Sequence, residues 1–199
     1  MEITASMVKE LREKTNAGMM DCKKALTECD CDMAKAVDWL RQKGLAVAAK
    51  RADRQSSEGQ IMSYIHGGGK LGVLVEVNCE TDFTGKTDEF TQFARDLAMQ
   101  IAAANPICVA PEDLPAEVVE REKAIYLGQV KDSGKPEKIW DKIIEGKLKK
   151  FESEVCLLKQ AFVKDPDKTI EDLLNEMRAK TGENVQIRRF ARFVLGEQS

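Results

Sequence analysis

The stretch VQIRRFARFVL, residues 185–195, alternates apolar and polar side chains and is the clearest strand signal in the chain. One of its faces is apolar apart from Arg189, and the members of that face are Val185, Ile187, Ala191, Phe193 and Leu195. Two earlier runs, 60–65 and 71–79, also have strand character and are separated by HGGGK. Because helical segments lie between these runs and the last strand, the sequence predicts an α+β core in which that strand returns to the first hairpin.

Residues 1–53 form a separate pattern, in which apolar residues recur at helical spacing in three short segments. The middle segment runs from Met19 to Cys29, and Gly44 is a candidate stop for the third. The candidate capping residues are Thr4 or Ser6 for the first helix and Asp30 or Asp32 for the third. We therefore predict two domains, a three-helix module at 1–53 and an α+β core at 54–199.

Four further helices are predicted within the core domain. Their starts are marked by a capping residue or a proline, and the strongest end signal is Gly182. The predicted helices begin at Thr87, Pro115, Pro136 and Thr169, and the one that begins at Pro136 runs to about Leu158. The segment at 48–59 is charged and has no apolar period after Ala49, so we expect a helix tail that continues into a linker.

Composition excludes several classes of protein. The formal net charge of −3 argues against a dedicated nucleic-acid binder, which usually needs a basic surface. No run of apolar residues is long enough to cross a bilayer, and the N-terminus lacks the apolar segment of a signal peptide. We expect a cytoplasmic protein with no membrane partner.

The six cysteines are expected to be reduced thiols rather than a disulfide framework. There is no CxxC pair and His66 is the only histidine, so the usual zinc sites cannot be assembled. Cys29 and Cys31 form a lone CxC, which is a weak metal signal. We expect no metal or other cofactor.

Two patterns invite an enzymatic interpretation. HGGGK resembles part of a phosphate-binding loop, but Lys70 is followed by a strand rather than by Ser or Thr and a helix, which favours a hairpin loop. Glu80 and Asp82, with His66 as a base, could form a hydrolytic site. The chain has no second histidine and no nucleophile elbow, so we predict that it is not an enzyme and has no small-molecule substrate.

Two surfaces could bind a macromolecule. Arg188, Arg189 and Arg192, together with Phe190 and Phe193, could stack on single-stranded RNA, but an edge strand that its arginines keep soluble is the simpler interpretation. Met19 and Met20 begin the second helix, and adjacent residues cannot both face a narrow core. One exposed methionine, an adaptable contact residue, is therefore expected there unless the core is wide enough for both.

Phe83 raises the sharpest question in the sequence. It stands among polar residues in VNCETDFTGK, residues 77–86, directly after a predicted strand. Burial in a partner's pocket could contribute about 2–3 kcal/mol, the scale of an interface hot spot. The alternative is that Phe83 folds back onto its own hairpin or onto Phe90, and composition alone leaves the two possibilities open.

The surrounding motifs closely resemble the elongation factor Ts family. The resemblance is carried by LREKTNAGMMDCKKAL, YIHGGGKLGVLVEVNCETDF, VCLLKQAFVKDPDKTIEDLL and GENVQIRRFARFVLGE, which together cover nearly the whole chain. The length is similar to that of the shorter form of the family. One departure lies in the tip itself, where Thr84 stands in place of the family's valine.

This resemblance implies a fold, a partner and a set of contact residues. The N-terminal module would be a ubiquitin-associated-like three-helix domain, followed by a core with a small antiparallel sheet packed against helices. The chain would be a guanine-nucleotide exchange factor for elongation factor Tu in translation elongation, and would itself bind neither nucleotide nor metal. Asp82 and Phe83 would enter the partner and disturb the magnesium and phosphate site that holds GDP. Their flanks would be Thr81 and Thr84, and the contacts of the first domain would be Met19, Met20 and Lys23.

Other functions stay open at this level. A pure interaction adaptor would bind without accelerating nucleotide release, and a hydrolase would depend on His66. A sheet of about three strands also leaves an apolar face to cover, for which a homodimer is a plausible solution.

Overall fold

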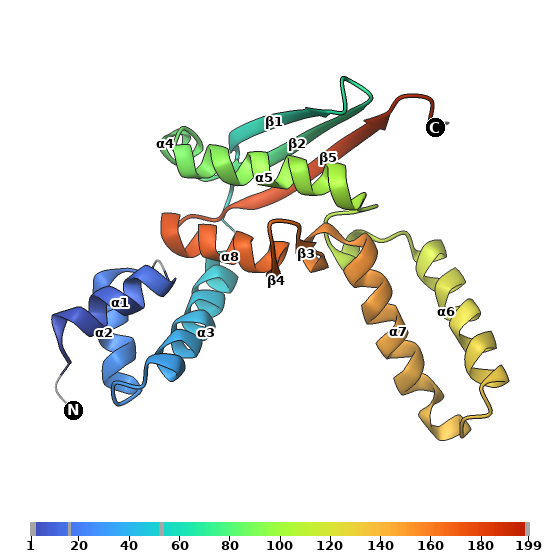
Figure 1. Ribbon diagram of the computed structural model, residues 1–199, viewed down its shortest axis with the longest axis horizontal. Helices are drawn as coiled ribbons and strands as arrows, with labels where there is room; N and C mark the ends of the chain where they lie inside the picture. Colours follow the sequence, from blue (N-terminus) through green and yellow to red (C-terminus); the bar gives the residue numbers. More distant parts are fainter. Residues whose placement is uncertain (1–2, 16, 52–53, 198–199) are drawn as a thin grey trace. The chain divides into compact units, whose positions relative to one another are not determined.

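The computed structural model describes residues 3–15, 17–51 and 54–197, and its order of elements is that of an α+β protein (Figure 1). Three helices come first, and a small antiparallel sheet packed with helices follows. The predicted fold class is therefore confirmed. In the part of the chain that is described, no helix is both long and apolar enough to cross a membrane.

The sheet contains β1 (Glu58–His66), β2 (Leu71–Cys79) and β5 (Gln186–Val194), in the order β1-β2-β5. The last strand returns to the first hairpin, as its alternation predicts, and it occupies an edge of the sheet. Residues 67–69, the three glycines of HGGGK, all have positive φ angles of 60°, 68° and 88°, which only glycine adopts readily. They form the turn between β1 and β2, so the hairpin interpretation of this motif is confirmed.

The N-terminal module consists of α1 (Ala5–Thr15), α2 (Met19–Glu28) and α3 (Met33–Arg51). Thr4 caps α1, since its Oγ1 accepts a hydrogen bond from the Met7 N–H. Asp32 caps α3 through the N–H of Lys35. The module has a core of its own, made of Val8, Leu11, Cys22, Ala25, Leu26, Ala36 and Leu40.

The predicted end of α3 at Gly44 is wrong, because the helix continues to Arg51. A glycine ends a helix when it takes a left-handed conformation, and Gly44 does not have one. Gly182 does, with a φ of 73°, and it follows the end of α8 (Ile170–Thr181) as predicted. The segment at 48–59 begins as a helix tail, as expected, and its positions 52 and 53 lie outside the described residues.

The remaining predicted helices are present, and the start that differs most is the one expected at Pro136. Thr87 caps α5 (Asp88–Ala104), whose Phe90 N–H donates to the Thr87 hydroxyl. The helix expected from Pro136 begins instead as a 3-10 turn, and the α-helix starts at Trp140. Besides α5 and α8, the helical elements of the core are α4 (Asp82–Gly85), η1 (Pro111–Asp113), α6 (Ala116–Asp132), η2 (Glu137–Ile139), α7 (Trp140–Val155) and η3 (Leu157–Lys159).

A short hairpin of β3 (Ala161–Phe162) and β4 (Asp165–Thr169) has no counterpart in the sequence prediction. It is held by the fully buried side chain of Gln100, which donates to the carbonyl of Ala161 and accepts from the N–H of Val163. Gln100, which lies 61 residues before Ala161, thus forms hydrogen bonds of the kind that a neighbouring strand would form.

The described residues divide into two compact units. The first comprises Met1–Gln60, Val77–Phe93 and Asp172–Gln186, and the second comprises Ile61–Glu76, Ala94–Glu171 and Ile187–Ser199. The division into domains at residue 53 stays a prediction. All the residues of the candidate site described next belong to the first unit.

Candidate functional site

The site is the turn that follows β2. Thr81 is the N-cap of α4, because its hydroxyl accepts a hydrogen bond from the N–H of Thr84 at 3.3 Å. The four-residue helix carries Asp82 and Phe83 on its outer side and leaves Thr84 5% exposed. Successive residues of this helix therefore have opposite environments.

Phe83 is 82% exposed, the largest exposed fraction among the exposed large hydrophobic residues. The sequence left open whether this ring folds back onto its own chain or is presented to a partner. A ring folded back against Phe90 would have lost most of that exposure, and Phe90 itself is fully buried without it. The structure thus excludes the fold-back.

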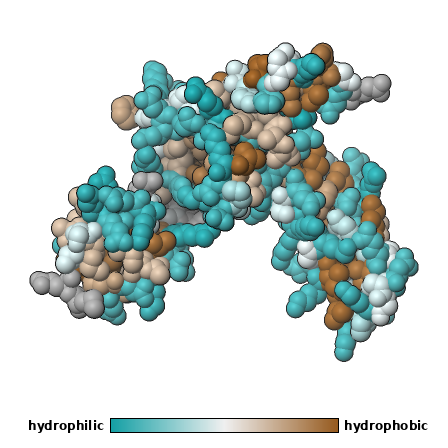
Figure 2. Space-filling view, in the orientation of Figure 1, coloured by the Kyte–Doolittle hydropathy of each residue, from teal (hydrophilic) through white to brown (hydrophobic). Residues whose placement is uncertain are grey.

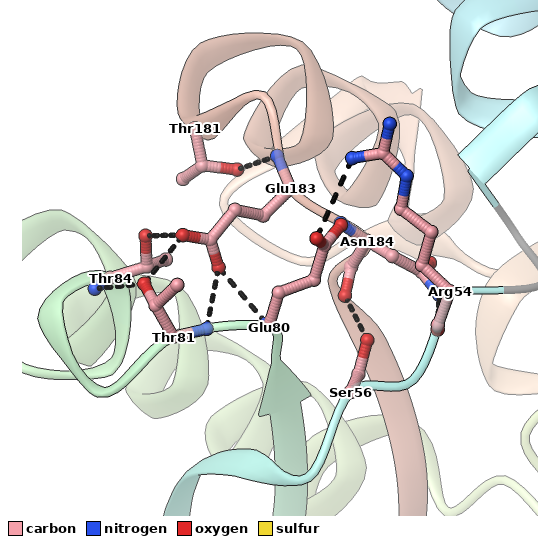
Figure 3. Close-up of polar contacts among 8 residues, drawn as sticks. All are labelled: Arg54, Ser56, Glu80, Thr81, Thr84, Thr181, Glu183 and Asn184. Carbon is pink, nitrogen blue, oxygen red and sulfur yellow. Dashed lines mark hydrogen bonds and ion pairs between the residues drawn. The ribbon is translucent and has the colours of Figure 1, made fainter.

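Thr84 points into the unit and contacts a residue far away in the sequence. Its hydroxyl donates to Oε1 of Glu183 at 2.6 Å, and the hydroxyl of Thr81 donates to the same oxygen at 2.6 Å (Figure 3). The other oxygen, Oε2, accepts from the N–H groups of Glu80 and Thr81 at 3.0 and 3.1 Å. One carboxylate therefore receives four donors from the segment that carries Phe83.

These donors also set the charge of Glu183. Burial alone would raise the pKa of this carboxyl, but the hydroxyls of Thr81 and Thr84 and the backbone N–H groups of Thr81 and Glu80 hold the pKa below its usual value. Glu183 is therefore an anion at neutral pH, and an anion is the stronger acceptor.

A second set of polar contacts fixes the base of the turn from the other side. The N–H of Asn184 donates to Oε1 of Glu80 at 2.6 Å, and Arg54 lies 3.5 Å from Oε2 of Glu80 (Figure 3). The Asn184 amide donates to the carbonyl of Arg54 at 2.8 Å, and the hydroxyl of Ser56 donates to the carbonyl of Asn184 at 2.6 Å. Asn184 is 1% exposed, so these bonds form out of water, where they are strong.

The backbone beneath α4 approaches β1 closely. A Cβ added to Gly85 would lie 3.3 Å from the Cα of Gly59, and one added to Gly59 would lie 2.1 Å from the carbonyl oxygen of Val77. Gly59 also has a φ of 133°. The side chain of Gln60 completes this contact by donating to the Gly85 carbonyl at 2.6 Å. The turn thus rests on a close approach that depends on glycine.

Asp82 lies on the exposed side of α4 and forms an ion pair with Lys86, one helical turn later. The hydrogen bond to Asp82 raises the pKa of the Lys86 ammonium. Both side chains are well exposed, so the pair adds little to stability.

The N-terminal module presents the other three predicted contact residues on its surface. Met19 and Met20 are 58% and 76% exposed, and Lys23 is exposed as well. Both methionines therefore lie outside the core of the module, whose buried residues in α2 begin at Cys22. The sequence predicts one exposed methionine here, and the structure exposes both.

The residues of the alternative chemistries have other partners. His66 Nδ1 lies 2.8 Å from the hydroxyl of Tyr64, whereas Glu80 binds Asn184 and Arg54. Arg189, which belongs to the arginine and aromatic pattern of β5, donates to Glu76 at 2.7 Å. This pattern lies on an edge strand, which agrees with the simpler interpretation of its arginines.

The six cysteines are all free thiols, in agreement with the sequence prediction. Among the residues that the structure describes, no cluster of three His, Cys, Asp or Glu side chains could hold a metal ion. Cys108 and Cys156 are buried and face each other, with their sulfur atoms 3.6 Å apart.

The burial of these thiols predicts their reactivity. Burial raises the pKa of Cys156 to about 12 and that of Cys79 to about 11, so almost none of either is thiolate at pH 8. We expect iodoacetamide at pH 8 to modify Cys29 and Cys31, which are partly exposed, well before it modifies Cys79 or Cys156. Peptide mass mapping over time measures this order, and the chain unfolded in guanidinium is the control in which all six should react alike. Equal rates in the folded protein would contradict the burial described.

Sequence reasoning missed Glu183 and Asn184 as parts of this site. They follow Gly182 at the end of α8 and precede β5, and nothing in their spacing connects them to residues 80–84. The available signal was the position of two polar residues at a junction between a helix and a strand, where polar groups that become buried need partners.

Comparison with known proteins agrees with the pattern of these motifs. The description of the family Elongation factor TS matches residues 2–197 of the chain. The chain is 65% identical to elongation factor Ts of Desulfosudis oleivorans over 195 residues, which cover 98% of each chain. It is 65% identical to that of Desulfotalea psychrophila over 98% of this chain and 100% of the relative. Identity to that of Carboxydothermus hydrogenoformans is 62%, over 98% of this chain and 90% of the relative.

Proposed function

Because the chain belongs to the elongation factor Ts family, we propose that it is the guanine-nucleotide exchange factor for elongation factor Tu in the cytoplasm. The observation that carries this proposal is Phe83, which is 82% exposed at the end of a strand and held there by a capped helix. A large apolar side chain in that position gains free energy only when another surface covers it.

We propose that Asp82 and Phe83 enter the nucleotide-binding domain of the partner and disturb the magnesium ion and the phosphate site that hold GDP. The two residues lie side by side on the exposed side of α4, and Thr81 and Thr84 flank them. Thr81 is exposed, so its surface can contact the partner while its hydroxyl stays bonded to Glu183. Thr84 faces inward, so its part in this flank is to hold the tip.

The exposed residues of α2 give the proposal a second contact. Met19 and Met20 offer flexible apolar side chains, and Lys23 adds a positive charge within one helical turn of them. We propose that this face of the module binds the same partner and supplies affinity at a distance from the nucleotide.

Exchange of this kind needs no catalytic group. By thermodynamic linkage, whatever affinity for GDP is lost when the factor binds is matched by an equal loss of affinity for the factor when GDP binds. A thousandfold weakening of GDP corresponds to about 4 kcal/mol. That exceeds the roughly 2–3 kcal/mol that one buried phenylalanine contributes, so the other contacts must supply the rest.

The direct test is the release of fluorescent GDP from elongation factor Tu, followed in a stopped-flow instrument with excess unlabelled GDP. We expect the release rate to rise with the concentration of the protein and then to saturate. An adaptor would bind the partner but leave the release rate at its spontaneous value, and that result would contradict the proposal. His66→Ala tests the hydrolase alternative and should leave exchange intact.

We also propose that the open side of the sheet binds a second copy of this chain. Large apolar side chains are exposed on β1, on β2 and at the end of β5, and four of them, Ile65, Leu74, Phe193 and Leu195, line one shallow groove. Figure 2 shows hydrophobic residues at the surface in this part of the protein. These residues, with their exposed fractions, are Ile61 (70%), Ile65 (66%), Leu74 (46%), Phe193 (65%) and Leu195 (77%).

Sedimentation of the free protein tests this interface. We expect a dimer, and Ile65→Lys should shift the protein toward the monomer because it places a charge in the apolar groove. A wild-type monomer at every concentration would contradict the proposal for this face without affecting the proposed exchange activity.

A further inference from the structure

We infer that Glu183 is a positioning residue for exchange, which holds the Asp82–Phe83 tip in the orientation that enters the partner. This inference rests on the proposed function and adds to it a residue that lies about a hundred positions away from the tip in sequence.

Hydrogen bonds from a distant residue hold the helix that carries Phe83. The α4 helix has four residues, which is too short to be stable by itself in water. Its N-terminal turn is instead tied to one carboxylate by two backbone N–H groups and two hydroxyls, at distances from 2.6 to 3.1 Å. Together these bonds fix the backbone on the N-terminal side of Phe83 and the side chain on its C-terminal side.

Glu183 is itself held in place by its neighbours in the chain. Its N–H donates to the hydroxyl of Thr181 at 3.3 Å, and Gly182 ends α8 immediately before it. On its other side, Asn184 is nearly fully buried and is bonded to Glu80, Arg54 and Ser56. Figure 3 shows the two residues reaching in different directions, Glu183 toward the tip and Asn184 toward the segment that leads from the N-terminal module.

A loosened tip would lose the single orientation of the Phe83 ring. Insertion of Phe83 requires the ring to arrive in one orientation, and a misplacement of about 1 Å can cost a hundredfold in a process that depends on geometry. Without the carboxylate, the N–H groups of Glu80 and Thr81 would turn to water. The tip would then sample several orientations, of which only some would fit.

Four single variants of the whole chain and one double variant test this inference. Glu183→Ala removes all four bonds, and Glu183→Gln is the conservative variant that keeps the shape and some of the bonds. Phe83→Ala is the positive control. Glu171→Ala is the matched control, since it removes a partly buried glutamate that is paired with Lys159 at 2.8 Å and belongs to the second unit.

Two quantities are measured for each variant. One is the rate of GDP release from elongation factor Tu at a saturating concentration of the factor, and the other is the concentration of the factor that gives half of that rate. We expect Glu183→Ala to lower the saturating rate about tenfold, which corresponds to about 1.4 kcal/mol, while the half-saturating concentration changes less than threefold. Glu183→Gln should recover most of the rate, and Glu171→Ala should match the wild type. The double variant Glu183→Ala/Phe83→Ala should be no slower than Phe83→Ala alone, because Glu183 acts through the ring.

A pH series on the free protein tests whether the charge of Glu183 is used, because a side chain that acted only through packing would give a stability difference independent of pH. A carboxyl with a lowered pKa stabilises the fold at pH values above its unfolded pKa, and this contribution is lost as the pH falls through the folded pKa. The stability difference between the wild type and Glu183→Gln, measured by urea denaturation, should therefore be constant near neutral pH and shrink as the pH falls below about 4.3. A difference that does not depend on pH would show that the charge of Glu183 is not used.

The possible failures can be told apart. If the wild-type chain does not accelerate GDP release, the proposed function fails and this inference fails with it. If the wild type is active and Phe83→Ala is slow, but Glu183→Ala releases GDP at the wild-type rate, only this inference is overturned. Additive losses in the double variant would likewise overturn it, since Glu183 would then act elsewhere. Should Glu183→Ala fold poorly, Glu183→Asp takes its place, because the shorter side chain keeps the charge but cannot reach all four donors. Its saturating rate should still fall, and a wild-type rate would overturn the inference.

Discussion

Replacing Phe83 by alanine should slow the release of GDP from elongation factor Tu by roughly 30- to 150-fold at saturating factor, the change that corresponds to about 2–3 kcal/mol. The ring makes few contacts within its own chain, because it is 82% exposed. Its removal should therefore leave the fold intact, and the lost energy should come almost wholly from the complex.

The same substitution separates the effect of Phe83 on the rate of GDP release from its effect on the affinity for the partner. Affinity for nucleotide-free elongation factor Tu should fall much less than the release rate, since the N-terminal face and the rest of the interface remain. Phe83→Leu is the control, because leucine keeps most of the apolar surface and should retain most of the rate. A release rate in Phe83→Ala equal to that of the wild type would rule out the insertion of this ring.

Replacing Gly59 by alanine should destabilise the protein by at least about 3 kcal/mol, near the upper end of what single substitutions do. The added Cβ would lie 2.1 Å from the carbonyl oxygen of Val77 and 2.8 Å from the Cα of Asn78. Both are backbone atoms of the paired strand and cannot move alone. The φ of 133° adds strain for any residue with a Cβ.

Thermal unfolding measures this effect, and the expected fall of the midpoint is roughly 6–12 °C for a chain of this size. Gly128→Ala is the matched control. Gly128 lies inside α6, and a Cβ added there would meet nothing within 4 Å, so alanine should stabilise that helix slightly. If Gly59→Ala and Gly128→Ala melted at the same temperature, the close approach of β1 to the base of the tip would be refuted.

The sheet was predictable because its signals are periodic and local. The alternation at 185–195 corresponds to β5, and the run at 71–79 has the bounds of β2. The hairpin β3–β4 was missed because its strands are short and one of them, DPDKT, is polar and contains a proline. Gln100 makes two hydrogen bonds to this hairpin, and a single distant side chain leaves no periodic trace in the sequence.

The candidate site was predictable in its exposed half and not in its buried half. Phe83 stood out because an aromatic residue in a polar turn is unusual, and the family resemblance then supplied a role for it. Thr84 and Glu183 lie 99 positions apart, and their contact follows only from the fold that brings the end of α8 to the end of β2. The prediction that α3 ends at Gly44 was wrong for a related reason, since glycine permits the end of a helix but does not impose it.

The capped helix that carries Phe83 also bears on how the two proteins meet. A flexible loop would have to become ordered when it docked, and the loss of chain entropy would oppose each encounter. In this chain the backbone around the ring is already ordered in the folded protein, by bonds from Glu183 and Asn184, which lie about a hundred positions away in sequence. A collision with the right orientation therefore meets a surface that is already shaped, and the time that a complex takes to form depends on diffusion and on the motions of the partner.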